Sequence, residues 1–479
     1  MSKIRKLAGE TALYGLGSIL PRMLNFLLVP LHTIDLFSRA EYGVITKLYA
    51  FAAVLNILFM FGMETAFFRF ATKPGADTRR IFNLAQTCVT LISVSVSAFF
   101  IGFSGPIASY FGISTHPEFI IWLTLILLTD ALVAIPFAQL RLEKKALKFA
   151  SLKITNVLLL LGLNFYFLKF AYDPAVNIGY VFLANVIANA FYIAFFLRTL
   201  LSWRPAFDRE ISPEIIRYAY PVMLTGVAGN INEMFSRTTL DWWLPVNFYG
   251  SISNKEAVGI FGACYKYAVF MNLGIQAFRY AAEPFFFTNA ADKNSPQLFS
   301  RVNHYFVITG CLVFIGISVN LDLLKYFIGE DFWVGLNIVP ILLMAYLFLG
   351  IYYNISIWFK LTDKTYYGTI ITVFGAVITI LGNYLLIPIA GYTGSSWAAL
   401  LCYFNMAVLC YVLGQRHYPI PYKLLQGFGY LLFALVLVQI SLWIPISNQI
   451  GATLFHAIIV LTFAITAFLL ERKNISPGT

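Results

Sequence analysis

The chain has 479 residues, of which 59% are hydrophobic and only 11% are charged. Soluble domains carry about a quarter charged residues, so this composition excludes an ordinary soluble protein and predicts an integral membrane protein. A net charge of +11 would suit a nucleic-acid-binding protein if the chain were soluble. In a membrane protein the charge reflects cytoplasmic loops that face anionic lipid, so we expect no nucleic-acid partner.

Apolar stretches long enough to cross the bilayer follow one another along the whole chain. A helix needs about 20 such residues to span about 30 Å of hydrocarbon. The first stretch is too long for the apolar part of a signal peptide, so we expect an uncleaved helix there. The fourteen predicted spans are residues 8–35, 41–70, 81–104, 118–140, 146–168, 178–200, 214–240, 257–287, 299–320, 335–359, 366–388, 394–414, 423–445 and 451–470.

The basic residues favour one orientation of these spans. With both termini in the cytoplasm, 23 of the 33 Lys and Arg residues fall in cytoplasmic segments or near the cytoplasmic ends of spans, 4 fall outside and 6 are assigned to the spans themselves. An excess of cytoplasmic Lys and Arg is what sets membrane orientation. No loop exceeds about twenty residues, which leaves no room for a soluble ATPase or catalytic domain. We therefore predict an all-α multi-pass protein that is not an enzyme.

Span 1 carries Arg22 about 21 Å along the helix from Ala8, near the middle of the bilayer. A charge at that depth costs roughly 2.5–3.5 kcal/mol on insertion scales, so it is seldom incidental. Pro21 and Asn25 beside it can open a bend in the helix. We favour an anion-binding arginine that faces a watery cavity, and the alternative is an arginine satisfied between packed helices.

Span 2 carries Lys47, Glu64 and Arg69. Lys47 and Arg69 are 22 residues apart, an offset of about 40° on a continuous helix, so we expect both on one face. That face would line a charged path, although Arg69 lies close enough to the cytoplasm to reach the interface instead. Glu64 is expected to neutralise one of the neighbouring charges.

Spans 7 and 8 hold the remaining cations. Span 7 contains Asn232, and its Glu233 and Arg237 are spaced to pair along one helix. In span 8, Arg279 and Glu283 repeat this i,i+4 spacing. Lys266, also in span 8, has no acid at that spacing, which makes it the stronger candidate for a cavity cation.

A weak internal repeat indicates two halves of similar fold. Gly43 and Tyr49 at the start of span 2 match Gly259 and Tyr265 at the start of span 8. Two six-helix lobes in parallel orientation, related by an axis along the membrane normal, would produce this pattern. The predicted divisions are an N-lobe over residues 1–205, a C-lobe over 206–418, and two appended spans over 419–479.

If the lobes face each other through spans 1, 2, 7 and 8, their cations converge on one central cavity. Guanidinium groups bind phosphate well, so such a cavity would suit a pyrophosphate. We expect no metal, cofactor or catalytic residue, and H⁺ or Na⁺ as the coupling ion. The predicted substrate-binding cations are Arg22, Lys47, Arg69, Arg237, Lys266 and Arg279, with Asn25, Glu64, Asn232, Glu233 and Glu283 in supporting or ion-coupling roles.

The first seventy residues carry motifs of a known group. The runs YGLGS from Tyr14, PRMLNF from Pro21, EYG from Glu41 and FGMETAFFRF from Phe61 resemble bacterial polysaccharide flippases. These proteins belong to the multidrug/oligosaccharidyl-lipid/polysaccharide exporter superfamily. The resemblance implies translocation of undecaprenyl-pyrophosphate-linked glycans across the bacterial inner membrane by alternating access. It also implies polysaccharide polymerase and glycosyltransferases as pathway partners.

The resemblance also bears on the substrate. Arg22 matches a cavity-lining arginine of the lipid II flippases, whereas Leu28 stands where those proteins carry a second arginine. This difference disfavours lipid II and favours an O-antigen, capsule or exopolysaccharide unit.

Two other functions stay open. A multidrug antiporter of the same superfamily would bind organic cations, which need an acidic cavity; here six cations outnumber the embedded acids Glu64, Asp130, Glu233 and Glu283. A membrane glycosyltransferase or polymerase would need a sizeable outer loop, and the first outer loop has only a few residues.

Overall fold

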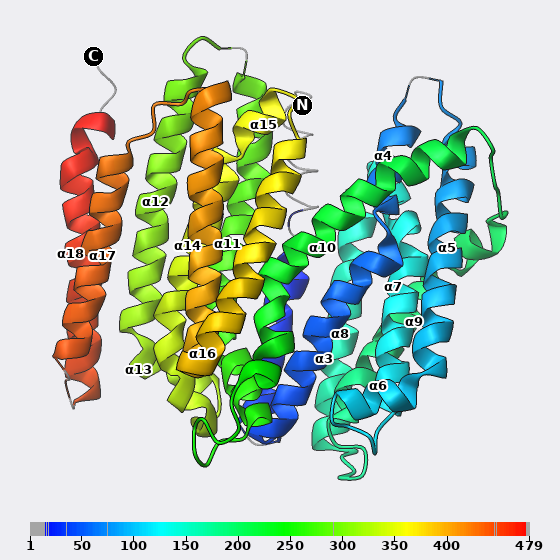
Figure 1. Cartoon of the computed structure of the whole chain (residues 1–479), viewed down its shortest axis with the longest axis horizontal. Helices are drawn as coiled ribbons and strands as arrows, with labels where there is room; N and C mark the ends of the chain where they lie inside the picture. Colours follow the sequence, from blue (N-terminus) through cyan, green and yellow to red (C-terminus); the bar gives the residue numbers. More distant parts are fainter. Residues whose placement is uncertain are drawn as a thin grey trace. The chain divides into compact units, whose positions relative to one another are not determined.

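The computed structural model describes residues 15–475 except 16, 18, 35, 74, 291, 445 and 447. Every regular element within the described residues is a helix, which confirms the predicted all-α class (Figure 1). The beginning of the first predicted span, residues 8–14, lies outside the described residues. The described part of this span is helical at residues 19–25.

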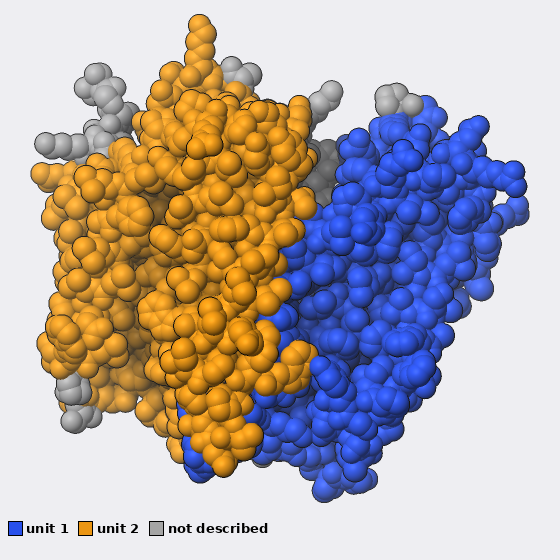
Figure 2. Space-filling model, viewed as in Figure 1, with its two compact units in different colours: residues 1–241, 249–259 blue, residues 242–248, 260–479 orange. Residues whose placement is uncertain are grey.

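The chain folds into two compact units. Unit 1 comprises residues 1–241 and 249–259, and unit 2 comprises residues 242–248 and 260–479 (Figure 2). These units divide the chain by compactness, whereas the predicted lobes divide it by repeat at residues 205 and 418, so the lobe boundaries remain a prediction. The helices of unit 1 are α2 (Leu28–Thr33), α3 (Arg39–Met60), α4 (Met63–Ala71), α5 (Thr78–Gly102), α6 (Ser104–Tyr110), α7 (Glu118–Leu142), α8 (Ala146–Lys169), α9 (Gly179–Ser202) and most of α10 (Ile211–Trp243).

Helix α11 begins in unit 1 and continues into unit 2, which holds the rest of the chain. In unit 2 the C-terminal helices α17 and α18 pack against each other and against α12 (Figure 1). The elements are α11 (Asn254–Asn289), α12 (Ser295–Val319), α13 (Leu321–Leu324), η1 (Lys325–Phe327), η2 (Glu330–Ile338), α14 (Val339–Ile355), α15 (Ile357–Leu361), α16 (Tyr366–His417), α17 (Leu424–Trp443) and α18 (Gln449–Ile475).

Eleven helices in the described residues are long and apolar enough to cross a membrane. The protein is therefore a multi-pass membrane protein, although the predicted count of fourteen spans is not confirmed. Helix α16, with 52 residues, contains both predicted spans 366–388 and 394–414, which meet at a bend at Gly391. The 33-residue α10 contains the predicted span 214–240 and is not among the eleven.

Span 2 is broken in the middle, contrary to our expectation of one continuous helix. Helix α3 starts at a capping box in which Ser38 and Glu41 satisfy each other's backbone N–H groups. It ends at Phe61 and Gly62, both left-handed with φ of 47° and 70°. A side chain on Gly62 would also meet the carbonyl oxygen of Ala219 at 2.6 Å. The prediction that Lys47 and Arg69 share a helix face assumed one continuous helix, and the break removes that basis.

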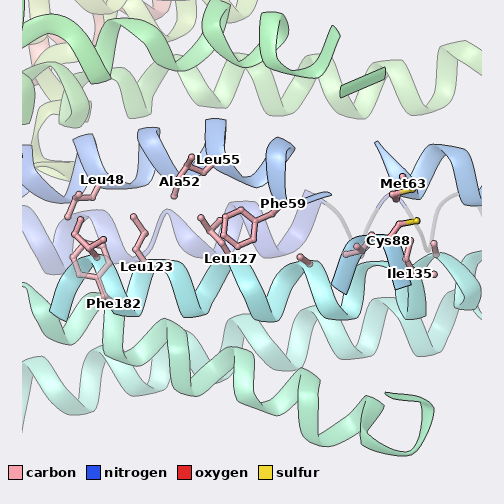
Figure 3. Packing of buried hydrophobic residues seen from close by; sticks show 14 of the residues in the cluster. Leu48, Ala52, Leu55, Phe59, Met63, Cys88, Leu123, Leu127, Ile135 and Phe182 are labelled. Carbon is pink, nitrogen blue, oxygen red and sulfur yellow. The ribbon is translucent and has the colours of Figure 1, made fainter. Parts of the chain in front are cut away.

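An apolar cluster in unit 1 joins α3, α7 and α9. Leu48 and Phe59 of α3 pack toward Leu127 of α7 and Phe182 of α9, and three of these, Leu48, Phe59 and Phe182, are fully buried (Figure 3). Lipid tails are as apolar as these side chains, so close packing rather than exclusion from water holds such helices together.

The loop between α9 and α10 is held by Asp208. Its carboxylate accepts hydrogen bonds from the backbone N–H groups of Ile211 and Glu210 at 3.2 and 2.9 Å, and it pairs with the guanidinium of Arg80. The hydrogen bonds first, and then Arg80, lower the pKa of Asp208 below its usual value.

This lowered pKa predicts a pH-dependent stability. A carboxyl group whose pKa falls on folding stabilises the fold above its unfolded pKa of about 3.9 and loses that contribution as the pH falls through the folded value. We expect Asp208→Asn to lower the thermal unfolding midpoint of the purified protein at neutral pH and to have a smaller effect at an acidic pH below about 3.9. The same difference at both pH values would show that the carboxylate charge does not act in this way.

Candidate functional site

Helices α3 and α11 touch near their starts, at Gly43 and Gly259, the two glycines that the internal repeat matches. The nitrogen of Gly259 lies 3.1 Å from the place of a side-chain carbon on Gly43, and the carbonyl oxygen of Lys255 lies closer still. A side chain on Gly259 would collide in the same way with the carbonyl oxygen of Arg39. Small residues let helices approach this closely in membranes. The basic-residue pattern assigns this end of both helices to the outside.

This contact makes a direct prediction. Gly43→Ala should destabilise the protein by about 1–3 kcal/mol, because the added carbon meets backbone atoms that cannot move alone. Gly274→Ala is the matched control. Gly274 lies in α11, the helix that Gly43 contacts, and nothing lies within 4 Å of a carbon added there. The control should be neutral or stabilising by up to about 1 kcal/mol. Thermal unfolding of the two purified variants distinguishes these outcomes, and equal stability would refute the contact.

A buried ion pair lies one turn further along α3. The Lys47 ammonium is 2.6 Å from the carboxylate of Asp241 in α10, and the two side chains are only 7% and 14% exposed. The backbone carbonyl of Asp241 accepts a hydrogen bond from Asn254 of α11 at 3.2 Å. The pair lines a small, partly open hollow together with Phe111. Helices α3 and α10 and the start of α11 are thus joined at one point within unit 1.

Neither member of this pair has the environment that the sequence suggested. Lys47 was expected to be a cavity cation, and its charge is balanced by an acid 194 residues away. Asp241 was placed in an outer loop, but α10 continues to Trp243 and carries it into the packed junction. Lys255, in the first turn of α11, extends the junction by donating to the carbonyl of Gly112 at 2.9 Å. We call this group, Gly43, Lys47, Asp241, Lys255 and Gly259, the outer junction.

The other predicted residues at the start of unit 1 lie apart from the outer junction. Arg22 and Asn25 are exposed on the N-terminal helical segment. Arg69 is also exposed, with its guanidinium carbon 4.5 Å from the ring centre of Tyr218. Glu64 pairs with Arg141 of α7, and not with Lys47 or Arg69 of its own span, one of which it was expected to neutralise.

In α10, Asn232 is buried and Glu233 and Arg237 are half-buried. The Arg237 guanidinium donates to the backbone carbonyl of Glu233 at 3.1 Å. This bond reaches the backbone of Glu233 and not its carboxylate, so the side-chain pair expected from the i,i+4 spacing stays a prediction. The same guanidinium contacts the sulfur of Met234 at 2.6 Å. These contacts fix the arginine against its own helix.

In unit 2 the cations of α11 differ in their surroundings. Lys266 is half-buried. Arg279 lies 3.9 Å from Glu283, as the spacing predicts, and its guanidinium carbon is 4.8 Å from the ring centre of Tyr353. Glu283 also binds Lys360 at 2.5 Å. Arg279 thus shares its acid with a second cation, which the sequence did not reveal.

A polar cluster inside unit 1 was not predicted from the sequence. Asp130 of α7 accepts a hydrogen bond from Asn189 of α9 at 3.0 Å and interacts electrostatically with Lys153 of α8. The Lys153 ammonium lies 4.2 Å from the ring centre of Phe137. Lys153 falls within the predicted span 146–168 and lies two turns inside α8, but it was not among the predicted span cations. Its distance from the start of the predicted span was the feature of the sequence that could have indicated a buried lysine.

Solved transporter structures share this fold. A lipid II flippase, MurJ, in an inward closed conformation matches with a TM-score of 0.73 and 12% identity over 97% of this chain and 100% of that chain. An inward-facing multidrug resistance MATE family transporter of the MOP superfamily matches with a TM-score of 0.62 and 15% identity, over 85% of this chain and 94% of that chain. The Vibrio cholerae MATE transporter VcmN in its bent form matches with a TM-score of 0.55 and 14% identity, over 89% of this chain and 98% of that chain. The chain therefore shares the fold of these transporters.

The family is defined by the sequence match. The polysaccharide biosynthesis protein family matches residues 35–280, just over half of the chain. The chain belongs to this family, which confirms the resemblance noted over its first seventy residues. A comparison with curated protein sequences gave no match.

Proposed function

We propose that this protein is a flippase of the bacterial inner membrane that translocates undecaprenyl-pyrophosphate-linked oligosaccharides by alternating access, with both termini in the cytoplasm. The observation that carries this proposal is the family match over residues 35–280, on a chain whose fold is shared with a lipid II flippase. The glycan is an O-antigen, capsule or exopolysaccharide unit, because Leu28 replaces the second arginine of the lipid II flippases.

In this proposal the exposed Arg22 binds the pyrophosphate, supported by Arg69, Lys266 and Arg279. Guanidinium groups bind phosphate oxygens in pairs, which holds the headgroup while the glycan crosses. Coupling to H⁺ or Na⁺ is part of the proposal, with Glu64, Glu233 and Glu283 as the candidate acids. No step in this cycle needs a catalytic residue.

The outer junction has a definite role in such a cycle. Alternating access requires that one end of the path be closed while the other is open. We propose that the glycine contact and the Lys47–Asp241 pair hold α3, α10 and α11 together while the outside is closed. The junction separates when the glycan is released outward.

The test is a deletion strain. We expect it to lose surface polysaccharide and to accumulate lipid-linked repeat units in the cytoplasmic leaflet, and expression of the intact protein should reverse both. Ethidium sensitivity is measured in parallel. Normal polysaccharide together with increased ethidium sensitivity would overturn the flippase proposal in favour of a multidrug antiporter.

A further inference from the structure

Unit 2 contains a groove that the proposed transport cycle does not use. It lies among α12, α14, α16 and α17 and is open on one side. Its walls are mostly apolar, formed by residues such as Val307, Phe348, Phe404, Val408, Phe428 and Leu431. All four helices belong to unit 2, with α17 alongside α12 (Figure 1). Such walls suit hydrocarbon chains.

Three buried polar atoms at this groove have no hydrogen-bond partner among the described residues. They are Oδ1 of Asn303, Nδ1 of His304 and the hydroxyl of Tyr422. Asn303 is 9% exposed and His304 only 3%. Buried polar atoms are nearly always paired, and these three unpaired atoms all belong to residues that line one groove, which favours a polar ligand there.

The orientation of His304 is fixed from the other side. Its Nε2 lies 2.8 Å from the carboxylate of Glu471 in α18, which also accepts a hydrogen bond from Tyr430 at 3.0 Å. The carboxylate therefore holds one ring nitrogen and leaves Nδ1 at the groove. Depending on its protonation, Nδ1 can donate or accept.

The polar atoms lie at one end of the groove, beside a lysine. The hydroxyl of Ser300 donates to the carbonyl of Pro421 at 2.6 Å, which brings Tyr422 and Lys423 next to the second turn of α12. Lys423 is exposed. Both α12 and α17 begin at this end, which the basic-residue pattern assigns to the cytoplasm. A cation is thus placed where lipid headgroups lie, above an apolar wall.

We propose that this groove binds an anionic glycerophospholipid with hydroxyl groups on its headgroup. Lys423 and the Tyr422 hydroxyl donate to the phosphate, Oδ1 of Asn303 accepts from a headgroup hydroxyl, and the acyl chains follow the apolar wall. Among the described residues that line the groove there is one lysine and no arginine. A single phosphodiester fits this charge better than a diphosphate, for which arginine forks are favoured. The site is therefore distinct from the proposed path of the glycan carrier.

The experiment uses the full-length protein in detergent, titrated with phosphatidylglycerol or with phosphatidylcholine of the same acyl chains, and bound lipid is counted by native mass spectrometry. We expect preferential binding of phosphatidylglycerol. Tyr422→Phe and Lys423→Gln should each weaken it about tenfold, as for one hydrogen bond to a charged group. Tyr422→Phe removes only an unpaired hydroxyl, so it should fold normally.

Matched controls are Tyr384→Phe and Lys293→Gln, which change an exposed tyrosine and an exposed lysine away from the groove. They should bind phosphatidylglycerol as the unaltered protein does. Equal binding of the two lipids, or unchanged binding by both groove variants, would overturn the proposal. Displacement of phosphatidylglycerol by an equal concentration of undecaprenyl phosphate would also overturn it, since the groove would then serve the carrier lipid.

Discussion

Arg22→Ala is expected to abolish surface glycan while the protein still reaches the membrane at near-normal level. The side chain is exposed on the N-terminal helical segment, so its removal leaves no buried partner unsatisfied. What is lost is the guanidinium that, in the proposed function, binds the pyrophosphate. Lipid-linked repeat units should accumulate in the cytoplasmic leaflet, which extraction and mass spectrometry would detect.

Two further variants make this prediction specific. Arg22→Lys should export glycan at a reduced rate, because an ammonium keeps the charge but cannot bind two phosphate oxygens in the fork geometry. Arg209→Ala removes an exposed arginine from the loop before α10 and should export normally. Normal export by Arg22→Ala would show that this arginine does not bind the substrate, whereas the deletion strain tests the function itself.

Lys47→Ala is expected to have the largest effect on stability. It leaves the carboxylate of Asp241 buried without its partner, and breaking a buried pair from one side costs about 3–5 kcal/mol. The double variant Lys47→Ala/Asp241→Asn removes the unbalanced charge and should recover most of this loss. Unfolding midpoints of the purified proteins measure both effects.

The chain offers a matched control for this pair. Lys73 and Glu214 form an ion pair at 4.0 Å whose side chains are 52% and 64% exposed. Exposed pairs contribute at most about 1 kcal/mol, so Lys73→Ala should change the midpoint little. If the Lys47 and Lys73 variants were equally stable, the outer junction would not depend on its ion pair.

The effect of these variants on export separates the stability of the junction from its role in transport. The double variant should be nearly as stable as the unaltered protein but should export glycan less efficiently, because the closed outside loses its ion pair. Unimpaired export by the double variant would leave the Lys47–Asp241 pair as a structural feature only.

Much of the fold follows from the sequence alone. Long apolar stretches can satisfy their backbone groups in a membrane only as helices, so composition and stretch length already determine an all-helical multi-pass protein. Local pairs were equally accessible, since Arg279 and Glu283 lie on one helix and their spacing brings them together. The family was also recognisable, because its motifs in spans 1 and 2 are continuous in sequence.

Only the tertiary structure decided which distant residues meet. Lys47 lies 194 residues from Asp241, and Glu64 lies 77 residues from Arg141. The sequence repeat matched Gly43 with Gly259 but gave no indication that the two touch. Helical periodicity determines which side chains share a face, whereas the choice of the opposing helix depends on packing between segments. A left-handed break such as the one at Phe61 removes the basis for even a shared face, which is why charge positions could be predicted and their partners could not.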